Sequence, residues 1–227
     1  NRHNIIWIDY NATVLGSKLM PWSYTVNSIR YYHQWKMLNQ KEILLPDAEI
    51  VTDSRDICVL IIGESARSWN FSLYGYEKET NPLMKADSVT ALKAKASETY
   101  TTAAVKALLS HKPAEELYEI LPNYLYRNGV DVIWRRSNWG TPPLHIEKDF
   151  GKSDLKERFP EADSDYDGIL FHGLKEDIAA SDSLKIFIGI HGYTSHGPSY
   201  FSNVPEEHKV FFPECRTVEM SDAKTSE

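Results

Sequence analysis

Two apolar runs of this sequence end in side chains that can bind metals or transfer protons. Glu64 follows the run at 57–62, and His191 and His196 follow the run at 183–190. Because the carboxyl ends of parallel strands meet at one edge of a sheet, these side chains are expected to lie close together. A carboxylate and imidazoles are ligands that zinc accepts. The local sequence also allows structural roles, in which the carboxylate caps the next helix and the histidines are ordinary surface or core residues.

Hydroxyl and amide groups extend this set. Thr101 and Thr102 stand just before a helix-forming run at 103–109, and Asn138 lies in a polar loop after the apolar run at 130–134. The amino end of a helix favours negative charge and binds phosphate. A threonine hydroxyl there becomes a nucleophile only when a base or a metal activates it. The pattern leaves open whether the threonines cap the helix or react.

The elements that position these groups predict an α/β fold. The unbroken apolar run at 57–62, which contains the thiol of Cys58, is expected to be a strand buried on both faces, as in a parallel sheet covered by helices. Periodic apolar residues predict helices over 113–128 and 167–180. Residues 141–165 show no periodicity and are expected to form a loop. We therefore predict a three-layer α/β/α sandwich.

Composition narrows the class of protein. The chain has 227 residues, 42% of them hydrophobic, so one α/β domain with a sizeable core is expected. A net charge of -7 argues against nucleic acid as a partner, because such a surface needs a basic patch. Two cysteines are too few for a disulfide scaffold, and no apolar run has the length of a membrane span.

Residues 1–46 are enriched in Tyr and Trp, and a helix is predicted over 21–39. Aromatic residues mixed with Lys and Arg are typical of a segment that lies on a bilayer surface. The alternative is an ordinary amphipathic helix packed on the domain. A linker around Pro46 is expected to lead into the first core strand.

An ordered set of short motifs, spread over residues 57–215, resembles the phosphoethanolamine transferases. These are membrane-anchored enzymes of Gram-negative bacteria in the alkaline phosphatase and sulfatase superfamily. The resemblance implies an alkaline phosphatase-like fold, with residues 1–46 as a membrane-proximal region and residues 47–227 as the N-terminal part of a periplasmic catalytic domain. The motifs are Gly63-Glu64-Ser65-Ala66-Arg67, Asn70-Phe71-Ser72-Leu73-Tyr74-Gly75-Tyr76, Thr80-Asn81-Pro82, Thr101-Thr102-Ala103, Asp167-Gly168-Ile169-Leu170, Ser195-His196-Gly197-Pro198 and Phe212-Pro213-Glu214-Cys215.

The resemblance implies a zinc-dependent transfer. Glu64 is expected to be a zinc ligand, and Thr102 is expected to be the nucleophile that carries phosphoethanolamine and touches zinc. Thr101 remains an alternative, because the choice rests only on Ala103 following Thr102. Substrate binding is expected from His196, which holds the phosphate or a second zinc, from Asn138 and from His191.

The resemblance also implies partners and a location. The donor is expected to be phosphatidylethanolamine, and the acceptor lipid A, core oligosaccharide or another envelope component. The protein is expected to be anchored in the inner membrane, through segments that this chain lacks, with its catalytic domain in the periplasm.

The sequence departs from the family in several places. Cysteines of the family are replaced by Glu98 and Leu108, and Ala223 stands where Cys215 usually has a partner. Pro142 stands where some relatives have a phosphate-binding Lys. The Asp-His zinc ligands of the family do not occur in the chain. We therefore expect an incomplete domain that binds zinc weakly on its own.

The sequence is also compatible with three other functions. A phosphoglycerol transferase shares the Glu-Ser turn and the Thr nucleophile. A sulfatase-like hydrolase shares the fold, but the Cys/Ser-x-Pro-x-Arg motif of sulfatases is not present. A non-catalytic envelope binding domain is consistent with the missing Asp-His pair.

Overall fold

A computed structural model describes residues 11, 22–114, 116–163, 165–193, 195–214 and 216. Cys215 and Ala223 lie outside the described residues. The chain forms two compact units. The first comprises Asn1–Leu44 with Ala114–Tyr118, and the second Leu45–Pro113 with Glu119–Glu227.

The first unit contains helix α3 (Trp22–Leu38), close to the predicted bounds. Tyr24, Tyr31 and Trp35 on this helix are exposed. No helix in the described part of the chain is long and apolar enough to cross a membrane. Whether α3 lies on a bilayer or packs on a domain stays a prediction.

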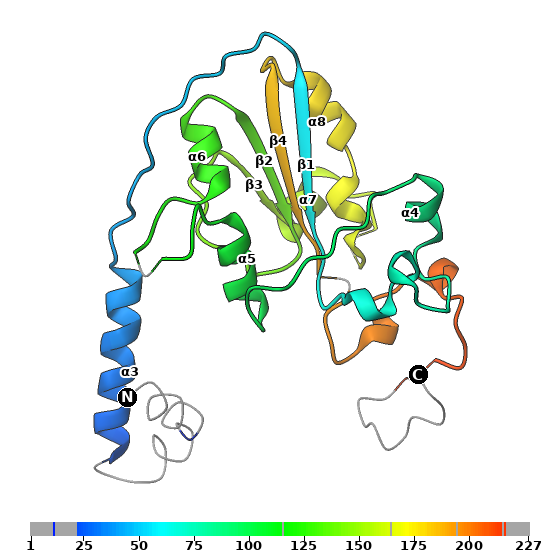
Figure 1. Ribbon diagram of the computed structural model, residues 1–227, viewed down its shortest axis with the longest axis horizontal. Coiled ribbons are helices and arrows are strands. Elements are labelled where there is room, and N and C mark those ends of the chain that lie inside the picture. The colour runs from blue at the N-terminus through cyan, green and yellow to red at the C-terminus, as the bar shows by residue number, and fades with distance from the viewer. Residues whose placement is uncertain are drawn as a thin grey trace. The chain divides into compact units, whose positions relative to one another are not determined.

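The second unit contains a parallel sheet of four strands in the order β1-β4-β2-β3 (Figure 1). The strands are β1 (Asp56–Ile62), β2 (Asp131–Arg136), β3 (Lys148–Gly151) and β4 (Lys185–His191). The register places the last residue of β4 opposite the last residues of β1 and β2. The loops that carry the candidate site residues therefore leave the sheet at the same edge.

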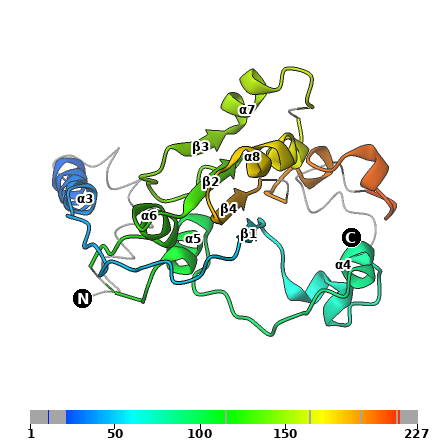
Figure 2. The ribbon, with the colours of Figure 1, turned by 90° about the horizontal axis from the view of Figure 1, so that it is seen from above.

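Helices cover both faces of the sheet. On one face lie α5 (Thr101–Leu109) and α6 (Leu121–Arg127), and on the other lie α7 (Lys152–Arg158) and α8 (Leu174–Ala180) (Figure 2). The predicted three-layer α/β/α architecture is confirmed. The remaining short elements are α4 (Pro82–Ala86) and the 3-10 helices Ser68–Asn70, Ser72–Tyr74, Asp167–Phe171, Tyr200–Ser202 and Glu206–His208.

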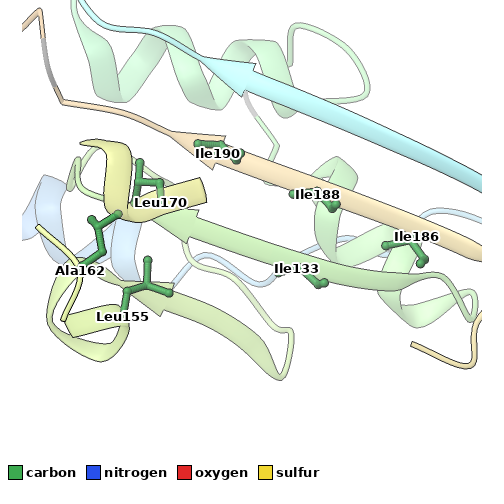
Figure 3. Close-up of a cluster of buried hydrophobic side chains, with 8 residues drawn as sticks. Ile133, Leu155, Ala162, Leu170, Ile186, Ile188 and Ile190 are labelled. Atoms are coloured by element: carbon green, nitrogen blue, oxygen red, sulfur yellow. The ribbon is translucent and has the colours of Figure 1, made fainter. Parts of the chain in front are cut away.

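Strand alternation divides the core between the two faces, because successive side chains of a strand point to opposite sides. Val132, Trp134 and Phe187 pack with residues of α5. The other face packs against α7 and the 3-10 helix at 167–171 (Figure 3). Its buried cluster consists of Ile133, Leu155, Ala162, Ile169, Leu170, Ile186, Ile188 and Ile190.

The expectation for the first strand was wrong. β1 lies at the edge of the sheet, and β4 is its only strand partner among the described residues. Ile57, Val59 and Ile61 are 47%, 48% and 60% exposed, and Cys58 is an exposed free thiol. An apolar run indicates that a strand is suited to burial. It does not indicate whether other described parts of the chain pack over that strand.

Two further expectations need correction. The helix predicted over 113–128 begins only at Leu121, and residues 116–120 are not helical. Pro122 explains this start, since proline is accommodated in the first turn of a helix but disrupts its interior. The stretch 141–165, expected to be a loop, contains β3 and α7, which are four and seven residues long.

Gly189 of β4 permits close packing against Trp134, because a Cβ atom at Gly189 would lie 2.0 Å from the indole. We predict that Gly189→Ala lowers the free energy of unfolding by about 1–3 kcal/mol, measured by urea denaturation. Gly168→Ala is the matched control, because its Cβ would meet nothing within 4 Å. Equal stability of the two variants would contradict this packing.

Candidate active site at the carboxyl edge of the sheet

The turn after β1 holds the carboxylate of Glu64. Ser65 adopts a positive φ of 49°, which is uncommon for a residue with a side chain. Its hydroxyl donates a hydrogen bond of 2.8 Å to Oε1 of Glu64. The turn thus fixes the carboxylate immediately beyond the end of the strand.

The second carboxylate oxygen of Glu64 joins three parts of the chain. It accepts hydrogen bonds of 2.9 Å from Oγ1 of Thr101 and 2.9 Å from Nδ2 of Asn138. A strand end, a helix start and a loop from another strand therefore converge on one atom. The structure brings together two of the predicted residues, Glu64 and Asn138.

The threonine that reaches this carboxylate is Thr101, whereas Thr102 is exposed and its side chain makes no hydrogen bond with the described residues. The two are adjacent on α5, where consecutive residues point about 100° apart. Neither threonine is the helix cap, since Tyr100 occupies that position without a side-chain cap. Of the two candidates, only Thr101 is positioned by a side-chain contact with Glu64.

These contacts keep Glu64 ionised. Burial raises the pKa of its carboxyl group, but hydrogen bonds from Ser65, Thr101 and Asn138 outweigh burial and hold the pKa below its usual value. At neutral pH the site therefore contains a fixed anion that has three hydrogen-bond donors.

Asn138 is buried, and its side chain is fully engaged. Its Nδ2 also approaches the carbonyl oxygen of Gly192 at 3.3 Å, and its Oδ1 accepts the backbone N–H of Gly140 at 3.0 Å. A Cβ at Gly140 would lie 2.9 Å from Cγ2 of Thr101, so this loop packs directly on the threonine. The amide that is expected to hold the transferred group contacts Glu64, and its role in substrate binding stays a prediction.

His191 is fully buried at the end of β4. Its Nδ1 lies 2.8 Å from Oγ1 of Thr141, and its Nε2 has no hydrogen-bond partner among the described residues. Burial lowers the pKa of His191, while the charges of Glu64 and Asp167 oppose this effect. The ring is therefore neutral at pH 7.

His196 lies in the loop after β4 and is only partly buried. Its Nδ1 lies 2.6 Å from the carbonyl oxygen of Gly197, so Nδ1 carries the proton. Its Nε2 makes no hydrogen bond with the described residues. A backbone carbonyl that fixes the tautomer in this way is typical of metal-binding histidines.

Asp167 joins two of the loops that carry candidate residues, a contact that the sequence did not predict. It accepts the Ser137 hydroxyl at 2.6 Å and the backbone N–H of Tyr193 at 2.7 Å. It thereby ties the loop after β2 to the loop after β4. In the sequence Asp167 belonged to a motif of the family resemblance and stood at the start of a predicted helix, and neither feature predicted these contacts.

A cavity of about 510 Å³ opens beside the contact between Glu64 and Thr101. A second cavity of about 530 Å³ is lined by Arg67 and Lys93 and shares Ala66 and Ala96 with the first. The two cavities therefore adjoin, and the second contains basic side chains suited to an anion.

Zinc ligands are only partly present. Glu64 and Thr101 offer two oxygens to a metal, whereas zinc in proteins is usually four-coordinate with three or four protein ligands. The described residues contain no group of three or more His, Cys, Asp or Glu side chains placed to hold a metal. The donor types fit zinc, but the described set does not complete a site.

Residues 57–225 match the family model for sulfatases. This stretch covers most of the chain. The chain belongs to the sulfatase family. Its fold and the order of its motifs agree with this membership.

Among curated sulfatase-family relatives, the phosphoethanolamine transferase EptA of Helicobacter pylori is 31% identical over 232 residues. The match covers 97% of this chain and 43% of the relative. The chain thus spans less than half the length of this relative.

Solved structures of the sulfatase-family relatives have the same fold. The C-terminal periplasmic domain of phosphoethanolamine transferase EptC from Campylobacter jejuni superposes with a TM-score of 0.65 at 28% identity, over 78% of this chain and 59% of that domain. The integral membrane protein EptA from Neisseria meningitidis gives a TM-score of 0.71 at 23% identity. The superposition covers 95% of this chain and 44% of EptA. The periplasmic domain of EptC from Escherichia coli, solved in complex with Zn, gives a TM-score of 0.54 at 19% identity. The superposition covers 72% of this chain and 51% of that domain.

Removal of the Thr101 hydroxyl tests the contact with Glu64. We predict that Thr101→Val raises the pKa of the Glu64 carboxyl group, because a donor that stabilises its charged form is lost. Carboxyl carbon NMR titration of the 227-residue chain measures this pKa. Thr102→Val should leave it unchanged, and an equal rise in both variants would contradict the assignment of the contact.

Proposed function

We propose that the protein transfers phosphoethanolamine from phosphatidylethanolamine to an envelope acceptor, through a covalent intermediate on Thr101. The observation that carries this proposal is the hydrogen bond between Thr101 and Glu64 at the amino end of α5, beside an open cavity. The names of the curated relatives support the choice of phosphoethanolamine as the transferred group.

The chemistry takes two displacements at one phosphorus. The Thr101 oxygen attacks the donor phosphorus, the bond to the diacylglycerol oxygen breaks, and a phosphoethanolamine ester of Thr101 forms. The proton of the Thr101 hydroxyl is lost and the departing diacylglycerol oxygen gains one. An oxygen of the acceptor then attacks the same phosphorus and releases Thr101 as a free hydroxyl. Glu64 fixes the orientation of the Thr101 hydroxyl, and Asn138 fixes Glu64. The helix amino end favours the negative charge that develops on the phosphoryl oxygens.

Zinc is the proposed cofactor, with Glu64 and Thr101 as two of its ligands. When bound, zinc lowers the pKa of a coordinated hydroxyl and polarises a phosphoryl oxygen. His196 is a proposed ligand of the phosphate or of a second zinc, since its Nε2 is available. His191 is proposed to support substrate binding from within the sheet rather than by direct contact, because its ring is buried.

Lipid A or a surface glycan is the proposed acceptor, and the proposed location is the periplasmic side of the inner membrane. Two findings support this. A structural relative is described as an integral membrane protein and lipooligosaccharide phosphoethanolamine transferase, and another is a periplasmic domain. The acidic chain, with a net charge of -7, does not favour nucleic acid as a partner.

A pair of adjacent variants tests the nucleophile in the natural protein that carries this chain. Thr101→Ala should reduce transfer from phosphatidylethanolamine on the order of 10³-fold or more and abolish the phosphoethanolamine adduct on threonine detected by mass spectrometry. Thr102→Ala should retain both. The reverse pattern would return the role to Thr102, and full transfer by both variants would overturn the covalent mechanism.

Metal analysis tests the zinc proposal. The 227-residue chain on its own should bind zinc weakly, because its described residues supply an incomplete ligand set. In the natural protein, Glu64→Gln should lower the zinc content, whereas Glu98→Gln, a change in the same cavity, should not. Tight stoichiometric zinc in the isolated chain would contradict the first expectation.

A further inference from the structure

Three rings form a cluster beside the proposed site. Tyr193 and His196 stack with centroids 4.8 Å apart, and Trp139 meets them at 5.5 Å and 5.8 Å. Trp139 comes from the loop after β2, and the other two come from the loop after β4. The two loops that carry the predicted substrate-binding residues thus also carry this cluster.

The two residues that flank Trp139 in the sequence both contact the proposed site. The preceding residue, Asn138, donates its side-chain amide to Glu64, and the following residue, Gly140, packs against Thr101. The backbone of Trp139 is therefore held next to both groups. The loop that carries Trp139 therefore contacts both Glu64 and Thr101.

Burial does not account for Trp139, because its side chain is 72% exposed. A large aromatic ring usually contributes to stability through the area it buries, and this one buries little. Its exposed face instead presents the negative side of an aromatic quadrupole to solvent. Cations bind such faces, and Trp binds them best of the aromatic side chains.

From this arrangement we propose that Trp139 and Tyr193 bind the ammonium group of the ethanolamine headgroup while its phosphate lies at Thr101. The proposal rests on the proposed function and specifies how the donor is chosen. The ammonium group is two carbons away from the phosphate oxygen, so a phosphate at Thr101 would leave it near the loop that carries Trp139. A glycerol headgroup has the same phosphate but no cation.

Aromatic rings suit this task better than a carboxylate would. A free carboxylate next to the bound phosphate would repel it, whereas a ring attracts the cation without carrying net charge. The two carboxylates that contact the loops of these rings, Glu64 and Asp167, already accept hydrogen bonds from other groups. Glu64 accepts three side-chain donors, and Asp167 accepts Ser137 and Tyr193.

The test compares two soluble competitors in the natural protein, phosphoethanolamine and glycerol phosphate, as inhibitors of transfer from phosphatidylethanolamine. Trp139→Leu should raise the inhibition constant of phosphoethanolamine, and the KM for phosphatidylethanolamine, about tenfold. It should leave the inhibition constant of glycerol phosphate unchanged. Trp139→Phe, which retains a ring, should have a smaller effect. Trp69→Leu is the matched control, because Trp69 is 80% exposed and has no ring partner among the described residues.

Several outcomes would overturn the proposal. These are equal weakening of both competitors in Trp139→Leu, no change in either, or no preference for phosphoethanolamine over glycerol phosphate in the unaltered protein. Each of these leaves the proposed function standing if the unaltered protein still transfers phosphoethanolamine. Absence of transfer by the unaltered protein counts against the proposed function instead, and direct binding of the two competitors, measured by calorimetry, then still decides the role of Trp139.

Discussion

The parallel pairing of β4 with β1 on one side and β2 on the other is the constraint on which the site depends. Parallel strands end at the same edge, so the turn after Ile62, the end of β4 at His191 and the loop after Arg136 begin side by side. Residues that are far apart in the sequence thus need only short connections to meet at Glu64. Two packed faces hold the strands in register, which keeps the edge rigid.

Charge sets the second requirement on this site. Its hydrogen bonds keep Glu64 ionised, and an ionised carboxylate repels a phosphate diester that approaches it. A cation between the two would remove this repulsion, which is the electrostatic argument for the proposed zinc. The basic side chains of Arg67 and Lys93 line the adjoining cavity and offer attraction for a second anionic group there.

The sequence was sufficient to predict the architecture, because long apolar runs and periodic helices reflect burial that the fold needs. It predicted the meeting of Glu64 and Asn138, since both follow strands. It did not predict which threonine faces them, because a one-residue change in the start of α5 rotates the side chains by about 100°. The sequence did not predict β3, because only one of its four residues, Phe150, has a large apolar side chain. The ring cluster of Trp139 depends on two loops whose conformation no periodicity encodes.

The bare side of β1 has a practical consequence for handling this chain. In the part of the chain that the structure describes, the outer edge of β1 pairs with no strand, and Ile57, Val59 and Ile61 are exposed. Such an edge is a template for pairing with another molecule. Natural sheets protect such edges with charges, proline or a covering segment, and the alternating residues of β1 carry none of these between Ile57 and Ile62. Self-association of the 227-residue chain in concentrated solution is therefore expected to use this edge, and a lysine on the exposed side of β1 is expected to reduce it.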